Sequence, residues 1–186
     1  MLLVTNGAVT EKHYLDWLAR LTREFSQGVA VTVKYIGGAP STVVKDLKGP
    51  RSDLSAFEEV WIIVDHDGED RSTFLRECKR LTTRRTIVHG VVSVPCFEVW
   101  LNAHYEPVRN YQSQADAQAH YAQLTRQPKG AKTIPDDLLC AEAMRDAVDR
   151  CHLPGEALPE RDTQGPCPST TMPHLLASLG LIAPLS

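Results

Sequence analysis

Segments typical of buried β-strands alternate with segments of helical period along the first half of the chain. The strand-like runs are residues 2–5, 29–36, 59–68 and 85–94, and the helical segments are residues 10–25, 40–48, 69–81 and 95–106, with Pro95 at or near the first position of the last one. Strands that alternate with helices in this way are typical of a parallel sheet with helices on both faces. We therefore predict an α/β fold with a mostly parallel sheet.

The character of the sequence changes near Asn110. Residues 111–124, 136–151 and 172–182 fit amphipathic helices, and a loop rich in Pro and Gly precedes the last of them. We predict a core over residues 1–108 and a helical C-terminal extension over residues 109–186 that packs on the core. A chain of 186 residues is long enough for one well-filled core.

Charge and cysteine content narrow the class of protein. The formal net charge of −3 argues against a protein that coats nucleic acid through its overall field, so an anionic polymer would be met at a local patch or through metal ions. The five cysteines form no C-x-x-C pair and indicate free thiols. Without a signal-like or membrane-length apolar run, we expect a cytoplasmic protein with no membrane contact.

Carboxylates follow three of the predicted strands. Asp65 and Asp67 end the run WIIVDHDG, Glu98 lies in the first turn after the strand that ends near Val94, and Glu11 follows the first strand together with Asn6. Carboxyl ends of parallel strands meet at one edge of a sheet, where ligands of open α/β sheets bind. Carboxylates at that edge suit Mg²⁺ or Mn²⁺, which would activate water for attack on a phosphodiester.

Each of these residues also has a structural interpretation. Asp65 and Asp67, two apart in extended chain, would lie on one side of the strand and repel each other without a cation, but a D-G pair also forms turns and caps helices. Thr10 is a candidate N-cap, and Glu11 and Glu98 both suit a first helical turn. Only their convergence at one edge favours the metal site.

Four motifs together resemble the RloB-like family. They are TEKHYLDWL, VWIIVDHDG, SVPCFEVWLNAHYE and CPSTTMPHLLASL, and they span most of the chain. The resemblance implies a Toprim-like core related to overcoming-lysogenization-defect nucleases, magnesium-dependent chemistry on RNA or DNA, and a role in bacterial defence against phage, often beside an ATPase partner. Oligomeric state stays open, with a homo-oligomer among the alternatives.

The first strand departs from the pattern of that family. The family usually has Glu-Gly at the end of this strand and Thr-Glu a few residues later, whereas this chain has Asn6-Gly7 followed by Thr10-Glu11. An Asn carbonyl can ligate Mg²⁺ but supplies no charge and no general base. The sequence thus favours a metal-dependent nuclease with Asp65, Asp67, Glu11 and Glu98 in the site and Asn6 as a neutral ligand. A degenerate binding or sensor subunit and a phosphoryl transferase remain as alternatives.

Basic residues and one histidine complete the candidates. Lys79, Arg80, Arg84 and Arg85, together with Lys129 and Lys132, are candidate phosphate contacts, although solvated surface charge also explains them and, for the first four, is favoured when they are taken alone. His104 is expected on the polar edge of the helix within residues 95–106. Trp17, Trp61 and Trp100 are expected in the core.

Overall fold

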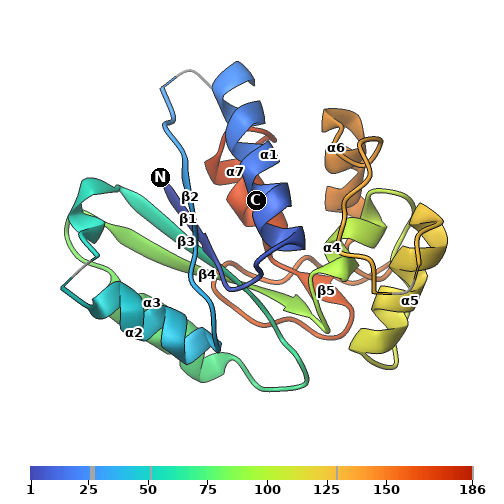
Figure 1. Ribbon diagram of the computed structural model, residues 1–186, viewed down its shortest axis with the longest axis horizontal. Helices are drawn as coiled ribbons and strands as arrows, with labels where there is room; N and C mark the ends of the chain where they lie inside the picture. Colours follow the sequence, from blue (N-terminus) through green and yellow to red (C-terminus); the bar gives the residue numbers. More distant parts are fainter. Residues whose placement is uncertain (26–27, 51, 129, 186) are drawn as a thin grey trace.

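The protein has an α/β fold in which a mostly parallel sheet forms the central layer (Figure 1). The computed structural model describes residues 1–25, 28–50, 52–128 and 130–185. Within them the sheet has five strands in the order β2-β1-β3-β4-β5. The strands are β1 (Leu2–Thr5), β2 (Thr32–Tyr35), β3 (Glu59–Asp65), β4 (Ile87–Val94) and β5 (Ser169–Thr170), and only β5 runs antiparallel to its neighbour. The predicted fold class is confirmed.

Helices cover both faces of this sheet (Figure 1). One face carries α1 (Thr10–Phe25), α4 (Glu98–Ala103) and α7 (Met172–Ser178), and α5 (Gln114–Thr125) and α6 (Ala141–Arg150) pack beside α4. The other face carries α2 (Pro40–Lys48) and α3 (Ser72–Leu81), while a short 3-10 turn, η1 (Leu54–Ala56), precedes β3. No helix in the described residues is long and apolar enough to cross a lipid bilayer.

The sequence of β3 is apolar without alternation because both faces of the strand are buried. Trp61 and Ile63 pack into the core under α1 and α4, whereas Val60, Ile62 and Val64 pack into the core under α2 and α3. A central parallel strand buried on both faces needs apolar residues at every position. The predicted core positions of Trp17, Trp61 and Trp100 are confirmed, because each of these side chains is buried.

The helix that follows β4 begins later than predicted. It starts at Glu98, three residues after Pro95. The carbonyl oxygen of Pro95 accepts a 3.1 Å hydrogen bond from the backbone N–H of Asp67. This bond connects the segment before α4 to the loop after β3 and is not a helical hydrogen bond. The prediction that Pro95 lies at the helix start is wrong for this reason.

The C-terminal part of the chain contributes to the sheet, which the sequence did not reveal. Strand β5 pairs with the end of β4 through Ser93 and Val94, and the hydroxyls of Ser93 and Thr170 lie 2.8 Å apart. Two residues are too few to show a periodic pattern. The boundary between residues 108 and 109 stays a prediction, but one segment of the predicted extension is a strand of the core sheet.

Candidate functional site

Three loops at the carboxyl-terminal edge of the sheet bring the predicted carboxylates together. Glu11 lies in the first turn of α1, Asp65 is the last residue of β3, Asp67 is in the loop after it, and Glu98 is the first residue of α4. We call these four residues the acidic cluster. Their negative charges act on one another, since those of Glu11, Asp67 and Glu98 all contribute to the raised pKa of Asp65. The edge predicted from the sequence is where they converge.

Asp65 is the most perturbed member of the acidic cluster. Burial raises the pKa of its carboxyl well above the usual value, and the charges of Glu11, Glu98 and Asp67 raise it further, while a hydrogen bond from the backbone of Phe97 opposes them. An ionised carboxylate in such a place is costly unless a cation neutralises it. Strongly raised pKa values of this kind are common at functional sites.

Asp67 does not continue the extended chain of β3, contrary to the prediction. Its φ of 51° is left-handed, and Gly68 follows with a φ of 75°. The loop turns here because the backbone N–H groups of His66 and Asp67 donate to the carbonyl oxygens of Ser93 and Pro95, at 2.9 and 3.1 Å. The two aspartates therefore meet through a turn and not through strand alternation.

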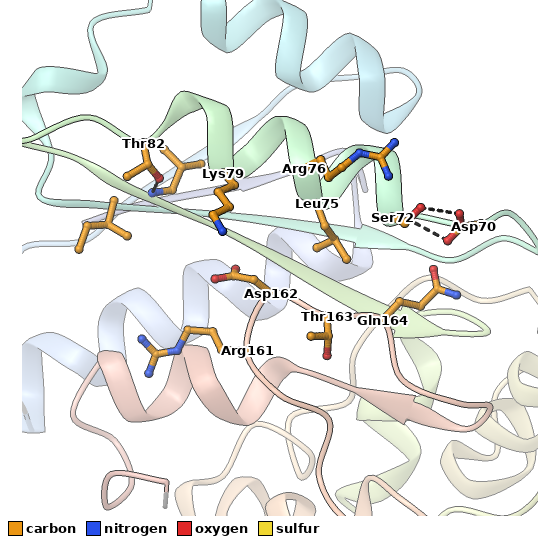
Figure 2. A pocket seen from close by; sticks show the side chains of 12 residues that line it. Asp70, Ser72, Leu75, Arg76, Lys79, Thr82, Arg161, Asp162, Thr163 and Gln164 are labelled. Atoms are coloured by element: carbon orange, nitrogen blue, oxygen red, sulfur yellow. Dashed lines mark hydrogen bonds between the residues drawn. The ribbon is translucent and has the colours of Figure 1, made fainter.

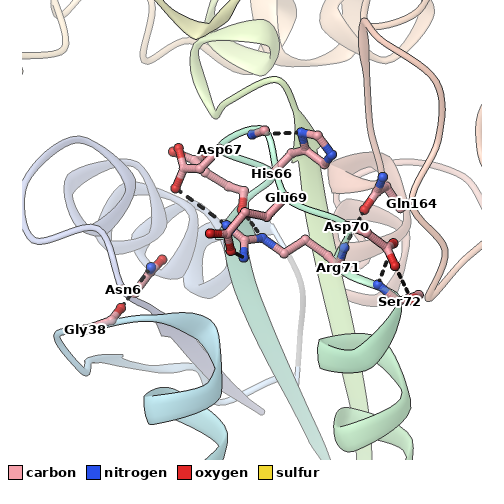
Figure 3. A network of polar contacts seen from close by, with 11 residues as sticks. Asn6, Gly38, His66, Asp67, Glu69, Asp70, Arg71, Ser72 and Gln164 are labelled. Atoms are coloured by element: carbon pink, nitrogen blue, oxygen red, sulfur yellow. Dashed lines mark hydrogen bonds and ion pairs between the residues drawn. The ribbon is translucent and has the colours of Figure 1, made fainter.

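The turn interpretation of this loop is partly right. Gly68 donates its backbone N–H to Nδ1 of His66 at 3.1 Å, so the loop satisfies some of its own backbone groups (Figure 3). The carboxylate that bonds to the start of α3 is that of Asp70, which accepts from the backbone N–H of Ser72 at 3.0 Å. Asp67 is not needed for that bond, and its carboxylate is exposed at the edge of the sheet.

Glu11 folds back over the turn between β1 and α1. A Cβ atom placed on Gly7 would lie 2.0 Å from Cδ of Glu11, so the missing side chain of Gly7 makes room for the carboxylate. Burial raises the pKa of Glu11; its own backbone N–H and the charge of Lys132 lower it, whereas Glu98 and Asp67 raise it. Thr10, the predicted N-cap, is the first residue of α1, and its hydroxyl donates to the carbonyl oxygen of Lys132 at 3.0 Å.

Asn6 lies beside the acidic cluster but is engaged elsewhere. Its side-chain Nδ2 donates to the carbonyl oxygen of Gly38 at 3.1 Å and thereby joins the end of β1 to the loop before α2 (Figure 3). A glutamate at this position has no N–H to donate. The Asn side chain thus has a structural role here that the acidic residue of the family pattern does not fill.

Arg71 is a residue of the site that the sequence analysis missed. Only 7% of it is exposed. Its Nε donates to the carbonyl oxygen of Asp65 at 2.9 Å, and Nη1 pairs with Glu69 at 2.7 Å, with Nη2 3.8 Å from Asp67 (Figure 3). In sequence Arg71 is one charge in a polar run, and no periodicity marks it as buried. The guanidinium holds the loop of Asp67 against the end of β3.

The oxygen atoms of the side chains at this edge of the sheet are of the chemical kind that binds divalent cations. Carboxylate and amide oxygens are the ligands that Mg²⁺ prefers, and the mutual repulsion of the acidic cluster is what a cation relieves. As the side chains stand, no group of three or more His, Cys, Asp or Glu residues in the described part of the chain is arranged to hold a metal ion. Ion binding at the cluster therefore requires side-chain rotation.

The predicted basic residues fall into separate places. Lys132 reaches the acidic cluster, because its charge lowers the pKa of Glu11. Lys79 and Arg80 lie in the last turn of α3 and Arg84 and Arg85 follow it, at the opposite edge of the sheet; Arg80 pairs with Glu77. Lys129 lies outside the described residues. Contact of any of these residues with nucleic acid stays a prediction.

The fold and the site define an α/β protein with interacting carboxylates at the carboxyl-terminal edge of a parallel sheet. The family model described as RloB-like protein matches residues 1–179 of the chain. The protein belongs to this family, which confirms the resemblance noted from its motifs. No curated protein and no solved structure matches the chain. The Toprim relation stays a prediction.

Proposed function

We propose that the protein is a divalent-metal-dependent nuclease that cleaves phosphodiesters of RNA or DNA. The observation that carries the proposal is the electrostatic interaction of Glu11, Asp65, Asp67 and Glu98 at the edge where ligands of open α/β sheets bind. Four acidic side chains from three separate loops, one of them with a strongly raised pKa, have a stabilising role only if a cation joins them.

The acidic cluster would hold Mg²⁺ or Mn²⁺, with the side-chain amide oxygen of Asn6 as a neutral ligand. The ion would supply an activated water and neutralise charge that develops on the phosphate. Lys132, already close enough to act on Glu11, adds a positive charge for the phosphate. Arg71 acts as a positioning residue, because it bonds to the main chain of Asp65 and pairs with the loop of Asp67.

We extend the proposal to a role in bacterial defence against phage beside an ATPase partner. Membership of the RloB-like family supports this extension. The proposed relation to Toprim nucleases rests on the same resemblance. The mostly parallel sheet with acidic residues at its carboxyl-terminal edge is consistent with such a relation.

A second candidate is a catalytically degenerate subunit that binds nucleic acid or another defence protein at the same edge. The observation that favours it is Asn6, which stands where the family pattern has an acidic residue. Its side-chain amide donates a hydrogen bond to the carbonyl oxygen of Gly38. This candidate needs no metal. The two functions therefore differ in their response to Mg²⁺ and Mn²⁺.

The test is a thermal-shift titration of the protein with Mg²⁺ and Mn²⁺. An ion that binds only the folded state raises the melting temperature, and Asp65→Ala should abolish that rise. Glu24→Ala is the matched control, because Glu24 is an exposed carboxylate near the other end of α1. Titrated proteins are then incubated with labelled RNA and DNA, and cleavage by the wild type but not by Asp65→Ala is expected. No ion response and no cleavage would overturn the nuclease in favour of the binding subunit.

A further inference from the structure

A groove of about 750 Å³ lies between α3, the outer edge of β4 and residues 161–164 (Figure 2). One end is formed by Asp70 and Ser72, in the segment that directly follows the loop of Asp67. The other end is formed by Thr82, just after α3, and Ile87, the first residue of β4. The groove thus leads away from the acidic cluster along the whole of α3. We call it the α3 groove.

Cationic side chains line both walls of the α3 groove. Arg76 and Lys79 come from α3, and Arg161 comes from the facing segment. In Figure 2 the side chain of Lys79 extends from α3 toward this segment. None of the three forms an ion pair with another described residue. Three cations that line one groove on a chain of net charge −3 indicate an anionic ligand.

The two carboxylates of the groove are engaged with protein donors. Asp162 accepts from the backbone N–H of Gly90 and contacts Nδ1 of His89, both at 2.9 Å. Asp70 accepts from the backbone N–H of Ser72 at 3.0 Å and from its hydroxyl at 2.5 Å. These bonds occupy lone pairs of both carboxylates, and the three cations of the described lining outnumber the two carboxylates.

The edge of β4 that borders the groove is poorly suited to pairing with another strand. Three outward N–H groups of β4 already have side-chain acceptors: Val88 bonds to Thr82, Gly90 to Asp162 and Val92 to Thr171, at 3.0, 2.9 and 3.3 Å. An edge strand with satisfied donors is a poor template for strand addition. The guanidinium of Arg161 is positioned over the ring of Trp61, 5.8 Å from its centroid.

We propose that the α3 groove binds the sugar–phosphate backbone of a single nucleic-acid strand that leads to the acidic cluster. This inference rests on the proposed nuclease function and names the path of its substrate. The ten residues of α3 extend over about 15 Å, which exceeds the length of a mononucleotide. A cleft of this volume is in the range of those that enclose small ligands, so it suits one strand and not a duplex.

The chemistry of the lining also predicts how the strand is recognised. Hydroxyl and amide groups of Thr82, Thr163 and Gln164 accompany the cations, and none of the described lining residues is aromatic. Phosphate and sugar contacts carry no sequence information, whereas base recognition in single strands depends on stacking. Binding in the groove should therefore depend on strand length and salt and be nearly independent of sequence.

The test measures binding in EDTA, so that it does not depend on metal or cleavage. Fluorescein-labelled oligothymidylate and oligouridylate of about 12 nucleotides are titrated with the full chain by anisotropy. Lys79→Ala/Arg161→Ala should weaken binding about tenfold or more and reduce the slope of log K against log salt by about 0.7 for each cation removed. Arg20→Ala/Lys34→Ala, which removes two exposed cations elsewhere, should leave both values nearly unchanged. Lys79→Arg should retain binding.

The remaining outcomes separate this proposal from the nuclease proposal. Equal weakening in both double variants, no binding by the wild type, a thymidine monophosphate that binds as tightly as the oligonucleotide, or a preference for duplex would each overturn the strand path. Cleavage with an unchanged KM in Lys79→Ala/Arg161→Ala would overturn it while the nuclease stands. Groove-dependent binding by a wild type that cleaves nothing would leave the strand path supported and overturn the nuclease.

Discussion

The guanidinium Nε of Arg71 donates a 2.9 Å hydrogen bond to the carbonyl oxygen of Asp65, at the point where β3 ends and the loop of Asp67 begins. The same guanidinium pairs with Glu69, and the backbone N–H of Arg71 donates to the side chain of Gln164 at 2.8 Å. One buried arginine thus links the end of the central strand, the acidic loop and the C-terminal segment.

Replacement of this arginine should destabilise the protein. Arg71→Met keeps the apolar stem but leaves the carbonyl oxygen of Asp65 without its charged donor, so we expect the free energy of unfolding to fall by about 2 kcal/mol. Urea unfolding measures this change. The control is Arg76→Met, because Arg76 is exposed and its guanidinium bonds only to the hydroxyl of Thr73 among the described residues. An equal loss in both variants would contradict the linking role of Arg71.

Removal of charge from the acidic cluster should stabilise the protein in the absence of metal. Burial and the neighbouring carboxylates disfavour the ionised form of Asp65, so Asp65→Asn/Asp67→Asn relieves this cost. We expect the melting temperature in EDTA to rise by about 2 to 4 °C, the shift that 1 kcal/mol produces in a protein of this size. Calorimetry provides the measurement.

The opposite sign is expected for a neighbouring aspartate. Hydrogen bonds from Ser72 lower the pKa of Asp70, so Asp70→Asn should lower the melting temperature. If Asp65→Asn/Asp67→Asn also lowered it, the two carboxylates would be structural and the metal site would lose its physical basis.

A methyl group on Gly7 should disturb the site and spare the fold. In Gly7→Ala the new Cβ would occupy the place of the Glu11 carboxylate, whose flexible side chain can move away. We expect a melting temperature in EDTA close to that of the wild type, but a thermal response to Mn²⁺ reduced as much as in Glu11→Gln. A full Mn²⁺ response in Gly7→Ala would show that the observed position of Glu11 is not needed.

The buried imidazole of His104 should make the protein sensitive to acid. His104 contacts the carbonyl oxygen of Trp100 at 2.9 Å through Nδ1 and the hydroxyl of Tyr14 at 3.0 Å through Nε2, and burial lowers its pKa from 6.5 to about 4. Below pH 6.5 the unfolded chain therefore binds a proton that the folded protein refuses until about pH 4, and stability falls as the pH is lowered through this range.

The size of this loss follows from the shift of the pKa. The free energy of unfolding should fall by up to about 3 kcal/mol more in the wild type than in His104→Gln between pH 7 and pH 4.5. Urea unfolding of both proteins at the two pH values measures this difference. A wild type that loses no more stability than His104→Gln over this range would contradict the prediction. The sequence analysis placed His104 on a polar helix edge, which is wrong, because only 5% of the residue is exposed.

The strands and helices of the core could be predicted because their patterns are local. The continuous apolar run of β3 and the helical spacing in α1 reflect burial that repeats along the chain. Two features had no such pattern. Strand β5 is two residues long, and in the segment before α4 the carbonyl oxygen of Pro95 bonds to the backbone N–H of Asp67, which is far away in sequence.

Local patterns were enough to predict the family, the α/β class and the edge of the sheet at which Glu11, Asp65, Asp67 and Glu98 would meet, because each of these residues lies at or just after the end of a strand or in the first turn of a helix. The surroundings of these residues depend on tertiary packing. The burial of Arg71, the position of Glu11 over Gly7 and the α3 groove arise from contacts between distant segments. Such contacts depend on how the layers pack, and no local periodicity records them.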